Sequence, residues 1–124
     1  MLRKIDHLVL TTAHLADCLA FYNALGFRSV DAGDHWELFS GDFKLNVHLK
    51  GHELEPKARN VQTGSADLCF ELDIPLAACR DALIACGIQP ETDIVTRHGA
   101  RGSMHSFYLR DPDENLIELC CYVP

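Results

Sequence analysis

The sequence lacks any apolar run long enough to cross a membrane and carries little positive charge. A membrane-spanning helix needs about 20 consecutive apolar residues, and no stretch of these 124 residues approaches that. Lys and Arg number 11 against 18 Asp and Glu, a net charge of −7, which argues against binding to nucleic acid or anionic membranes. The N-terminus also lacks the apolar segment of a secretory signal. We therefore expect a cytoplasmic protein without nucleic-acid or membrane partners.

The six cysteines include no Cys-x-x-Cys motif. Most lie in apolar, periodic segments, which favours buried free thiols in a reducing compartment over disulfides or a thiolate metal site. With 124 residues, of which 48% are hydrophobic, the chain can form one core without crosslinks. We expect a single domain over residues 1–124.

The two halves have the same order of expected elements. Each begins with a strand, continues with a helix whose apolar residues recur at helical spacing, and ends with three strands. In the first half these segments lie near residues 3–11, 15–25, 27–32, 35–40 and 43–49. In the second half they lie near residues 65–72, 76–86, 89–96, 103–110 and 115–122. The sequence predicts two β-α-β-β-β repeats, 1–50 and 65–124, joined by the polar segment 51–64.

Aligning the repeats matches polar residues within their first and last strands. His7 matches Asp67, an offset of 67 − 7 = 60, and His48 matches Glu118, an offset of 118 − 48 = 70. A lone histidine in a strand is usually a surface or core residue, but imidazoles and carboxylates at repeated positions are good metal ligands. Glu118 lies in an apolar run, where an unpaired carboxylate would be costly. The four residues are the candidate metal ligands.

Several segments resemble one known superfamily. They are IDHLVL at residues 5–10, GSADLC at 64–69 and LRDPDENLIEL at 109–119. With the paired β-α-β-β-β halves, they resemble the vicinal oxygen chelate superfamily of glyoxalase I, extradiol dioxygenases, and fosfomycin- and bleomycin-resistance proteins. Within it, the sequence is most similar to the glyoxalase domain-containing protein 5 group. The resemblance implies an α+β glyoxalase-like fold, in which the repeats form a curled mixed sheet around a cleft, and a homodimer.

The resemblance also implies a metal site and a reaction. In such proteins the first and last strands of each half hold a divalent ion, which carries over to His7, His48, Asp67 and Glu118. Asp67 departs from the usual histidine, and His48 from the glutamate of glyoxalase I. A bound ion (Zn, Ni, Mn or Fe are all compatible) would stabilise an enediolate of a small oxygenated substrate, with Asp67 or Glu118 as the catalytic base.

This resemblance favours a metal-dependent lyase or isomerase similar to lactoylglutathione lyase. Two alternatives stay open: a metal-free ligand-sequestering protein of the bleomycin-resistance type, and an extradiol-type ring-cleaving dioxygenase. The second is compatible with two histidines and one carboxylate around Fe(II).

Substrate-binding candidates lie in the second half. Residues 96–103 are basic and contain glycine, and we expect either a mobile lid whose Arg97 or Arg101 binds an anionic substrate group or a solvated surface loop. His105 aligns with His35 and is a further candidate, although a structural or exposed position suits either histidine. Tyr108 is expected to be a core or cleft-wall residue.

Overall fold

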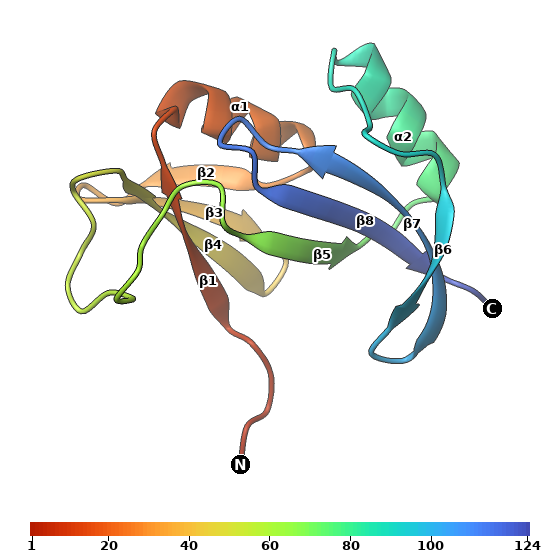
Figure 1. Cartoon of the computed structure of the whole chain (residues 1–124), viewed down its shortest axis with the longest axis horizontal. Helices are drawn as coiled ribbons and strands as arrows, with labels where there is room; N and C mark the ends of the chain where they lie inside the picture. Colours follow the sequence, from red (N-terminus) through yellow and green to blue (C-terminus); the bar gives the residue numbers. More distant parts are fainter. The chain divides into compact units, whose positions relative to one another are not determined.

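The computed structural model describes residues 1–124, which divide into two compact units, residues 1–64 and 65–124. Each unit has the element order β-α-β-β-β that the repeat predicts (Figure 1). The boundary follows the polar segment 51–64, which contains no helix or strand. The repeated α+β architecture is therefore confirmed, while a single domain stays a prediction.

Unit 1 is a four-stranded sheet with one helix. Its strands lie in the order β1-β4-β3-β2, with β1 parallel to β4 and the other neighbours antiparallel. Its elements are β1 (His7–Thr12), α1 (Leu15–Ala24), β2 (Arg28–Asp31), β3 (Trp36–Ser40) and β4 (Phe43–Leu49).

Unit 2 repeats this topology in the order β5-β8-β7-β6, with β5 parallel to β8. Its elements are β5 (Asp67–Glu71), α2 (Leu76–Ala85), β6 (Val95–Gly99), β7 (Gly102–Arg110) and β8 (Leu116–Tyr122).

In unit 1, one face of the sheet packs on the helix. The ring of Tyr22 in α1 lies 5.8 Å from that of Phe27, which lies 6.5 Å from that of Phe43 in β4. Because side chains alternate along a strand, Phe43 shares this helix-side face with the buried Leu45 and Val47. The opposite face, which carries the even-numbered residues of β4, is called here the helix-distal face of unit 1.

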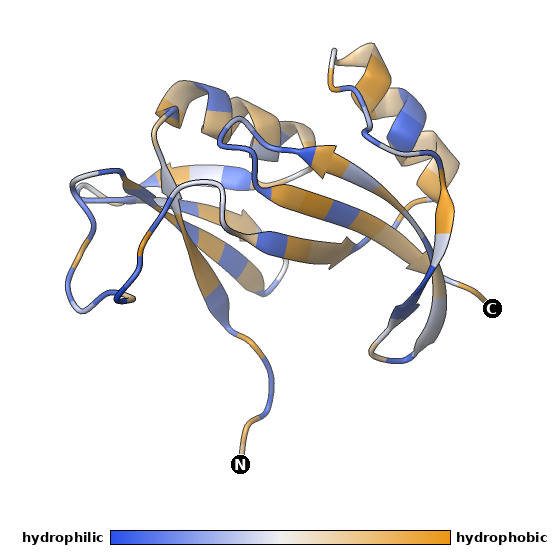
Figure 2. Cartoon of the chain, in the orientation of Figure 1, coloured by the Kyte–Doolittle hydropathy of each residue, from blue (hydrophilic) through white to orange (hydrophobic).

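The same division holds in unit 2. Cys121 in β8 donates from Sγ to the carbonyl of Ile74, just before α2, at 3.4 Å. It shares the helix-side face with the fully buried Ile117 and with Leu119. The helix-distal face of unit 2 therefore carries the even-numbered residues of β8. Hydrophobic and hydrophilic segments alternate along β4, whereas β8 is hydrophobic along most of its length (Figure 2).

The basic segment 96–103 forms a hairpin, which corrects the expected loop. Residues 95–99 pair with residues 102–106 around a two-residue turn, and Gly102 has a φ of 126° that favours glycine. The strand expected at 89–96 begins only at Val95. Before it, the Glu91 N–H donates to the Tyr108 carbonyl at 2.8 Å, and the Tyr108 N–H donates to the Thr92 hydroxyl at 3.2 Å instead of to a backbone carbonyl.

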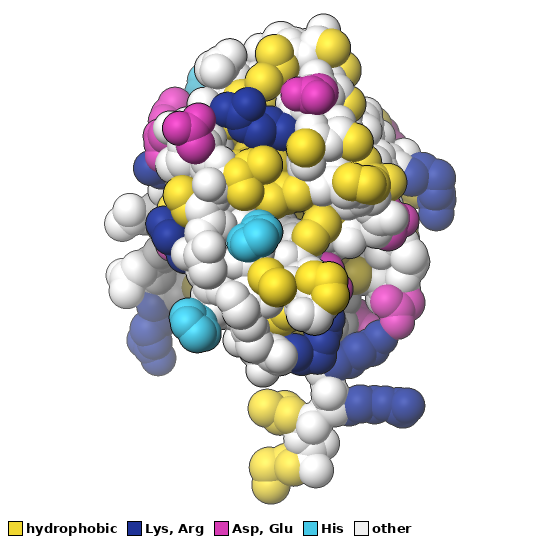
Figure 3. All heavy atoms as spheres, turned by 90° about the vertical axis from the view of Figure 1, so that its right-hand side faces the viewer, with side chains coloured by type: hydrophobic (Ala, Val, Ile, Leu, Met, Phe, Trp, Pro, Cys, Tyr) yellow, Lys and Arg dark blue, Asp and Glu magenta, His cyan; other side chains and the backbone are white.

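The first strand begins later than expected, at His7 rather than near residue 3. Its parallel partner β4 starts at Phe43, and His7 already lies opposite Lys44, so earlier residues have almost no strand to pair with. The N-terminal segment before it leaves Met1, Leu2 and Ile5 exposed (Figure 3).

All six cysteines are free. Cys18, Cys79 and Cys120 are buried, whereas Cys69 and Cys86 are exposed, which corrects the expectation that all six are buried. Neither helix is long and apolar enough to cross a membrane.

Candidate functional site

In unit 1 the helix-distal face carries His7, Asn46 and His48. The parallel pairing of β1 with β4 places Val9 opposite Asn46 and Thr11 opposite His48, and opposed residues point to the same face. His7 is exposed, and its Nδ1 lies 2.8 Å from Asp6 Oδ1. A ligating histidine commonly donates its second ring N–H to a carboxylate. His7 therefore has the arrangement of a ligand that binds through Nε2.

In unit 2 the helix-distal face carries Asp67 and Glu118. Asp67 is the first residue of β5 and is exposed. Glu118 lies opposite Cys69 in β5 and opposite Tyr108 in β7, so it occupies the middle of the sheet. Its Oε2 is buried and has no hydrogen-bond partner, and such an oxygen normally has one. Oε2 therefore lacks a partner, although side-chain hydrogen bonds with Glu118 are among the causes that raise the pKa of Cys69 and of Tyr108.

The strand pairing corrects the alignment of the two repeats. Val9 and Cys69 are equivalent at the offset of 60 that relates β1 to β5, because 69 − 9 = 60. Their partners are Asn46 and Glu118, an offset of 118 − 46 = 72. Glu118 is thus equivalent to Asn46, and its match with His48 at an offset of 70 is wrong. Asn46 Oδ1 is also buried without a hydrogen-bond partner.

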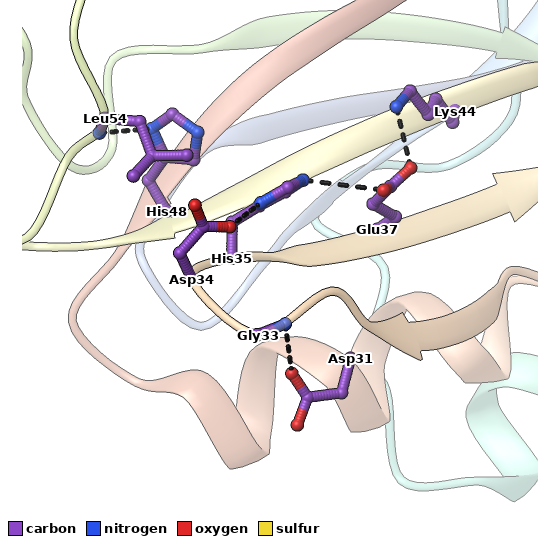
Figure 4. A network of polar contacts seen from close by, with 8 residues as sticks. All are labelled: Asp31, Gly33, Asp34, His35, Glu37, Lys44, His48 and Leu54. Atoms are coloured by element: carbon purple, nitrogen blue, oxygen red, sulfur yellow. Dashed lines mark hydrogen bonds and ion pairs between the residues drawn. The ribbon is translucent and has the colours of Figure 1, made fainter.

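His48 lies in a protected position at the end of β4 (Figure 4). Only 8% of the residue is exposed, and its ring packs edge-on against that of His35, with centroids 5.9 Å apart. Burial, and then the neighbouring His35, lowers the pKa of His48. The Leu54 N–H donates to its Nδ1 at 3.4 Å, so the ring proton belongs on Nε2. In this arrangement Nε2 carries the proton, so His48 would bind a metal through Nε2 only by giving up its contact with Leu54, and its role as a ligand stays a prediction.

Around His35, charged groups pair with one another (Figure 4). Its Nδ1 lies 2.7 Å from Asp34 Oδ1, and its Nε2 lies 3.5 Å from Glu37 Oε1. Lys44 Nζ donates to Glu37 Oε2 at 2.7 Å. The hydrogen bond with Lys44 lowers the pKa of Glu37, and the one with His35 lowers the pKa of Asp34. Both carboxylates therefore stay ionised and are already partnered.

Arg97 in β6 contacts a tyrosine of the neighbouring strand. Its Nε donates to Tyr108 Oη at 3.0 Å, its guanidinium carbon lies 5.5 Å from the centre of that ring, and Nη1 donates to the Thr96 carbonyl at 2.9 Å. Burial is the main cause that raises the pKa of Tyr108. The sequence offers no signal for this tyrosine, because a tyrosine in an apolar strand reads as a core residue.

Arg101 holds the β6–β7 turn in place. Its Nη2 donates to both carboxylate oxygens of Glu71, at 3.1 and 3.0 Å, and its guanidinium carbon lies 4.1 Å from the centre of the Tyr122 ring. The hydrogen bond with Glu71 raises the pKa of Arg101. His105 lies opposite Cys121, on the helix-side face, and is exposed. The structure therefore does not bring His105 together with Glu118.

The candidate donors occupy equivalent positions in both units. In each unit one candidate donor is the first residue of the first strand, His7 or Asp67. The other, Asn46 or Glu118, lies two positions after the residue that pairs with it, Lys44 or Leu116. No group of three or more His, Cys, Asp or Glu side chains is placed to hold a metal ion. The unpartnered oxygens of Asn46 and Glu118, together with the donor types, fit a divalent cation in their chemistry.

Comparisons with known proteins agree with this architecture. The chain is 43% identical to the glyoxalase domain-containing protein RDO1 of Mycosarcoma maydis, over 97% of this chain and 69% of that protein. The structure of virulence protein STM3117 from Salmonella typhimurium matches with a TM-score of 0.96 and 40% identity, covering 99% of each chain.

A more distant match supports the fold alone. The structure of lactoylglutathione lyase from Agrobacterium tumefaciens is 22% identical, with a TM-score of 0.73 over 95% of this chain and 92% of that one. Residues 4–119 match the sequence model of the Glyoxalase/Bleomycin resistance protein/Dioxygenase superfamily. The narrower resemblance to the glyoxalase domain-containing protein 5 group stays a prediction. Matched over nearly its whole length, the chain belongs to the Glyoxalase/Bleomycin resistance protein/Dioxygenase superfamily.

Proposed function

We propose that the protein is a metal-dependent enzyme acting on a small substrate with adjacent oxygens. Each unit by itself offers two candidate donors, His7 and Asn46 in unit 1, and Asp67 and Glu118 in unit 2. The observation that carries the proposal is the matched pair of unpartnered oxygens, Asn46 Oδ1 and Glu118 Oε2, at equivalent positions of the two sheets. A cation supplies the partner that each buried oxygen lacks.

The corrected donor set changes the expected metal. With Asn46 in place of His48, the candidate donors are one imidazole and three side chains with oxygen donors. Carboxylate and carbonyl oxygens suit Mn²⁺ and Mg²⁺, whereas imidazole- and thiolate-rich sites suit Zn²⁺. We therefore propose Mn²⁺ as the preferred ion. When bound, such an ion polarises the substrate's oxygens and stabilises the negative charge of an enediolate.

The protein's own side chains have distinct roles in this proposal. Asp67 is exposed, so it can accept a substrate proton and release it to water. Glu118 is half-buried in the middle of its sheet and is suited to a fixed ligand position. His48 presents Nε2–H from a buried ring, so it suits a hydrogen bond to a substrate oxygen.

Metal analysis tests the proposal most simply. Protein purified without chelators should contain a divalent ion, and Mn²⁺ titrated into metal-free protein should bind. His7→Ala and Glu118→Gln should each weaken that affinity by at least about 10-fold, as losing a metal's ligands or their supports does. A wild-type protein that binds no divalent ion would overturn the proposal and leave the metal-free binding protein as the function.

Activity assays then separate the reaction types. Loss of the hemithioacetal of methylglyoxal and glutathione reports lyase chemistry, and oxygen uptake with catechols reports ring cleavage. We expect the first type of reaction, which is the enediolate chemistry, and we expect it to require the ion. Oxygen-dependent catechol cleavage would contradict that assignment.

A further inference from the structure

Glu118 has two neighbours across its sheet, and both carry a proton on a polar atom. In the helix-distal face of unit 2, Cys69 lies opposite Glu118 in β5, and Tyr108 lies opposite it in β7. Directly opposed residues are close enough for their side chains to interact. The equivalent row of unit 1 contains Val9, Asn46 and Glu37. Only the second unit flanks its central residue with a thiol and a phenol.

The thiol of Cys69 donates its proton to another cysteine. Cys69 Sγ donates to Cys120 Sγ at 3.6 Å, diagonally across β5 and β8. A thiol has one hydrogen to donate, and the hydrogen bond with Cys120 raises the pKa of Cys69 more than the one with Glu118 does. Cys69 is therefore the weaker donor to Glu118, and Tyr108, on the other side of the row, is the stronger candidate.

The hydroxyl of Tyr108 still has its proton to donate. Tyr108 Oη accepts a hydrogen bond from Arg97 Nε at 3.0 Å, while Arg97 also bonds the Thr96 carbonyl and stacks on the ring. Arginine cannot accept a proton, so the Tyr108 O–H has to point away from it. Next to this phenol, on the same face, lies the Glu118 carboxylate, and a side-chain hydrogen bond with Glu118 is among the causes that raise the pKa of Tyr108.

We propose that Tyr108, held in place by Arg97, is a positioning residue that donates its O–H to Glu118 and fixes the orientation of that carboxylate. The hydrogen bond holds the other carboxylate oxygen and leaves Oε2, which has no partner, for a ligand. Partners of this kind typically change metal affinity 10–100-fold when they are removed. That consequence for a metal rests on the proposed function, whereas the hydrogen bond itself does not.

Metal-free protein gives the decisive test, because it separates this inference from the proposed function. In protein labelled with ¹³C at the glutamate carboxyl carbon, the Glu118 resonance is the one lost in Glu118→Gln. Tyr108→Phe removes only the hydroxyl and should move that resonance. Tyr122→Phe makes the same chemical change in the same sheet, where the hydroxyl accepts the Arg101 N–H at 3.1 Å, and should leave the Glu118 resonance in place.

The outcomes of this experiment test the hydrogen bond and the metal site separately. A Glu118 resonance that stays in place in Tyr108→Phe, or moves equally in Tyr122→Phe, would overturn the positioning role whatever the metal does. If the resonance moves as expected and the wild-type protein binds Mn²⁺, Tyr108→Phe should weaken Mn²⁺ binding about 10–100-fold. An unchanged Mn²⁺ affinity would then show that the hydrogen bond does not support a metal ligand. Arg97→Met, which keeps a long side chain but no N–H, should move the resonance in the same direction as Tyr108→Phe.

Discussion

Asn46 and Glu118 occupy the same position in the two sheets, and each keeps one buried side-chain oxygen without a hydrogen-bond partner. Each lies opposite the third residue of its unit's first strand, Val9 or Cys69. The two units therefore share more than an order of elements. They share a position at which a buried side-chain oxygen has no hydrogen-bond partner. That oxygen belongs to an amide in unit 1 and to a carboxylate in unit 2.

His48 should make the stability of the metal-free protein depend on pH. Burial and the neighbouring His35 lower its pKa from 6.5, so the unfolded chain takes up a proton at a higher pH than the folded protein does. The stability associated with neutral His48 is present above pH 6.5 and is lost as the pH falls toward the lower folded-state pKa.

Denaturant unfolding at about pH 7.5 and about pH 5.5, on either side of the ordinary histidine pKa, measures this effect. His48→Asn keeps an acceptor for the Leu54 N–H but cannot titrate, so it should reduce the loss of stability at the lower pH. His52→Asn, at an exposed loop position, should leave the pH dependence of the wild type. Equal pH dependence in His48→Asn and the wild type would contradict the account.

Gly99 should be intolerant of a side chain because of Tyr122. A Cβ at Gly99 would collide with Tyr122 Oη and lie 2.8 Å from Met104 Sδ. Gly99→Ala therefore has to displace the tyrosine, which breaks its hydrogen bond with the Arg101 N–H. We expect a loss of about 1–3 kcal/mol in the free energy of unfolding, as overpacking usually costs. In a Tyr122→Ala background the same substitution should cost clearly less, and an equal cost would rule out this clash.

Cys69 should react slowly for an exposed cysteine. Burial of the thiol, and then its contact with Cys120, raises the pKa of Cys69, and the thiolate is the reactive form. Cys86 is also exposed and has no sulfur partner. Brief treatment of the folded protein with iodoacetamide, followed by peptide mass spectrometry, should find Cys86 modified before Cys69. The reverse order would contradict the shielding of Cys69. As a control, unfolded protein should show six free thiols, as the structure does.

The sequence predicts the fold well because the repeated pattern of apolar residues determines it. The strand–helix–strand–strand–strand order, both helices and the polar join appear in the structure as expected. The β6–β7 hairpin is missed because its residues are polar and basic, and only pairing with β7 makes residues 95–99 a strand. Local composition does not reveal a partner that lies elsewhere in the chain.

The site is only partly predictable, for a reason of strand geometry. Side chains alternate with a period of two, so shifting the alignment by two residues keeps every residue on its own face. Both Asn46 and His48 are flanked by apolar residues, as Glu118 is, and only the pairing with β1 selects Asn46. The sequence favours His48 because histidine is the commoner ligand. Tyr108 is missed because its role depends on Arg97, a residue of another strand.

Mn²⁺ titration of metal-free protein, by calorimetry, tests the central assignment of the donor positions most directly. The matched variants are Asn46→Ala, which removes the unpartnered oxygen, and His48→Asn, which removes the imidazole and keeps an acceptor for Leu54. We predict that Asn46→Ala weakens Mn²⁺ binding by at least about 10-fold, while His48→Asn binds as the wild type does. A loss of affinity in His48→Asn, with wild-type affinity in Asn46→Ala, would contradict the account.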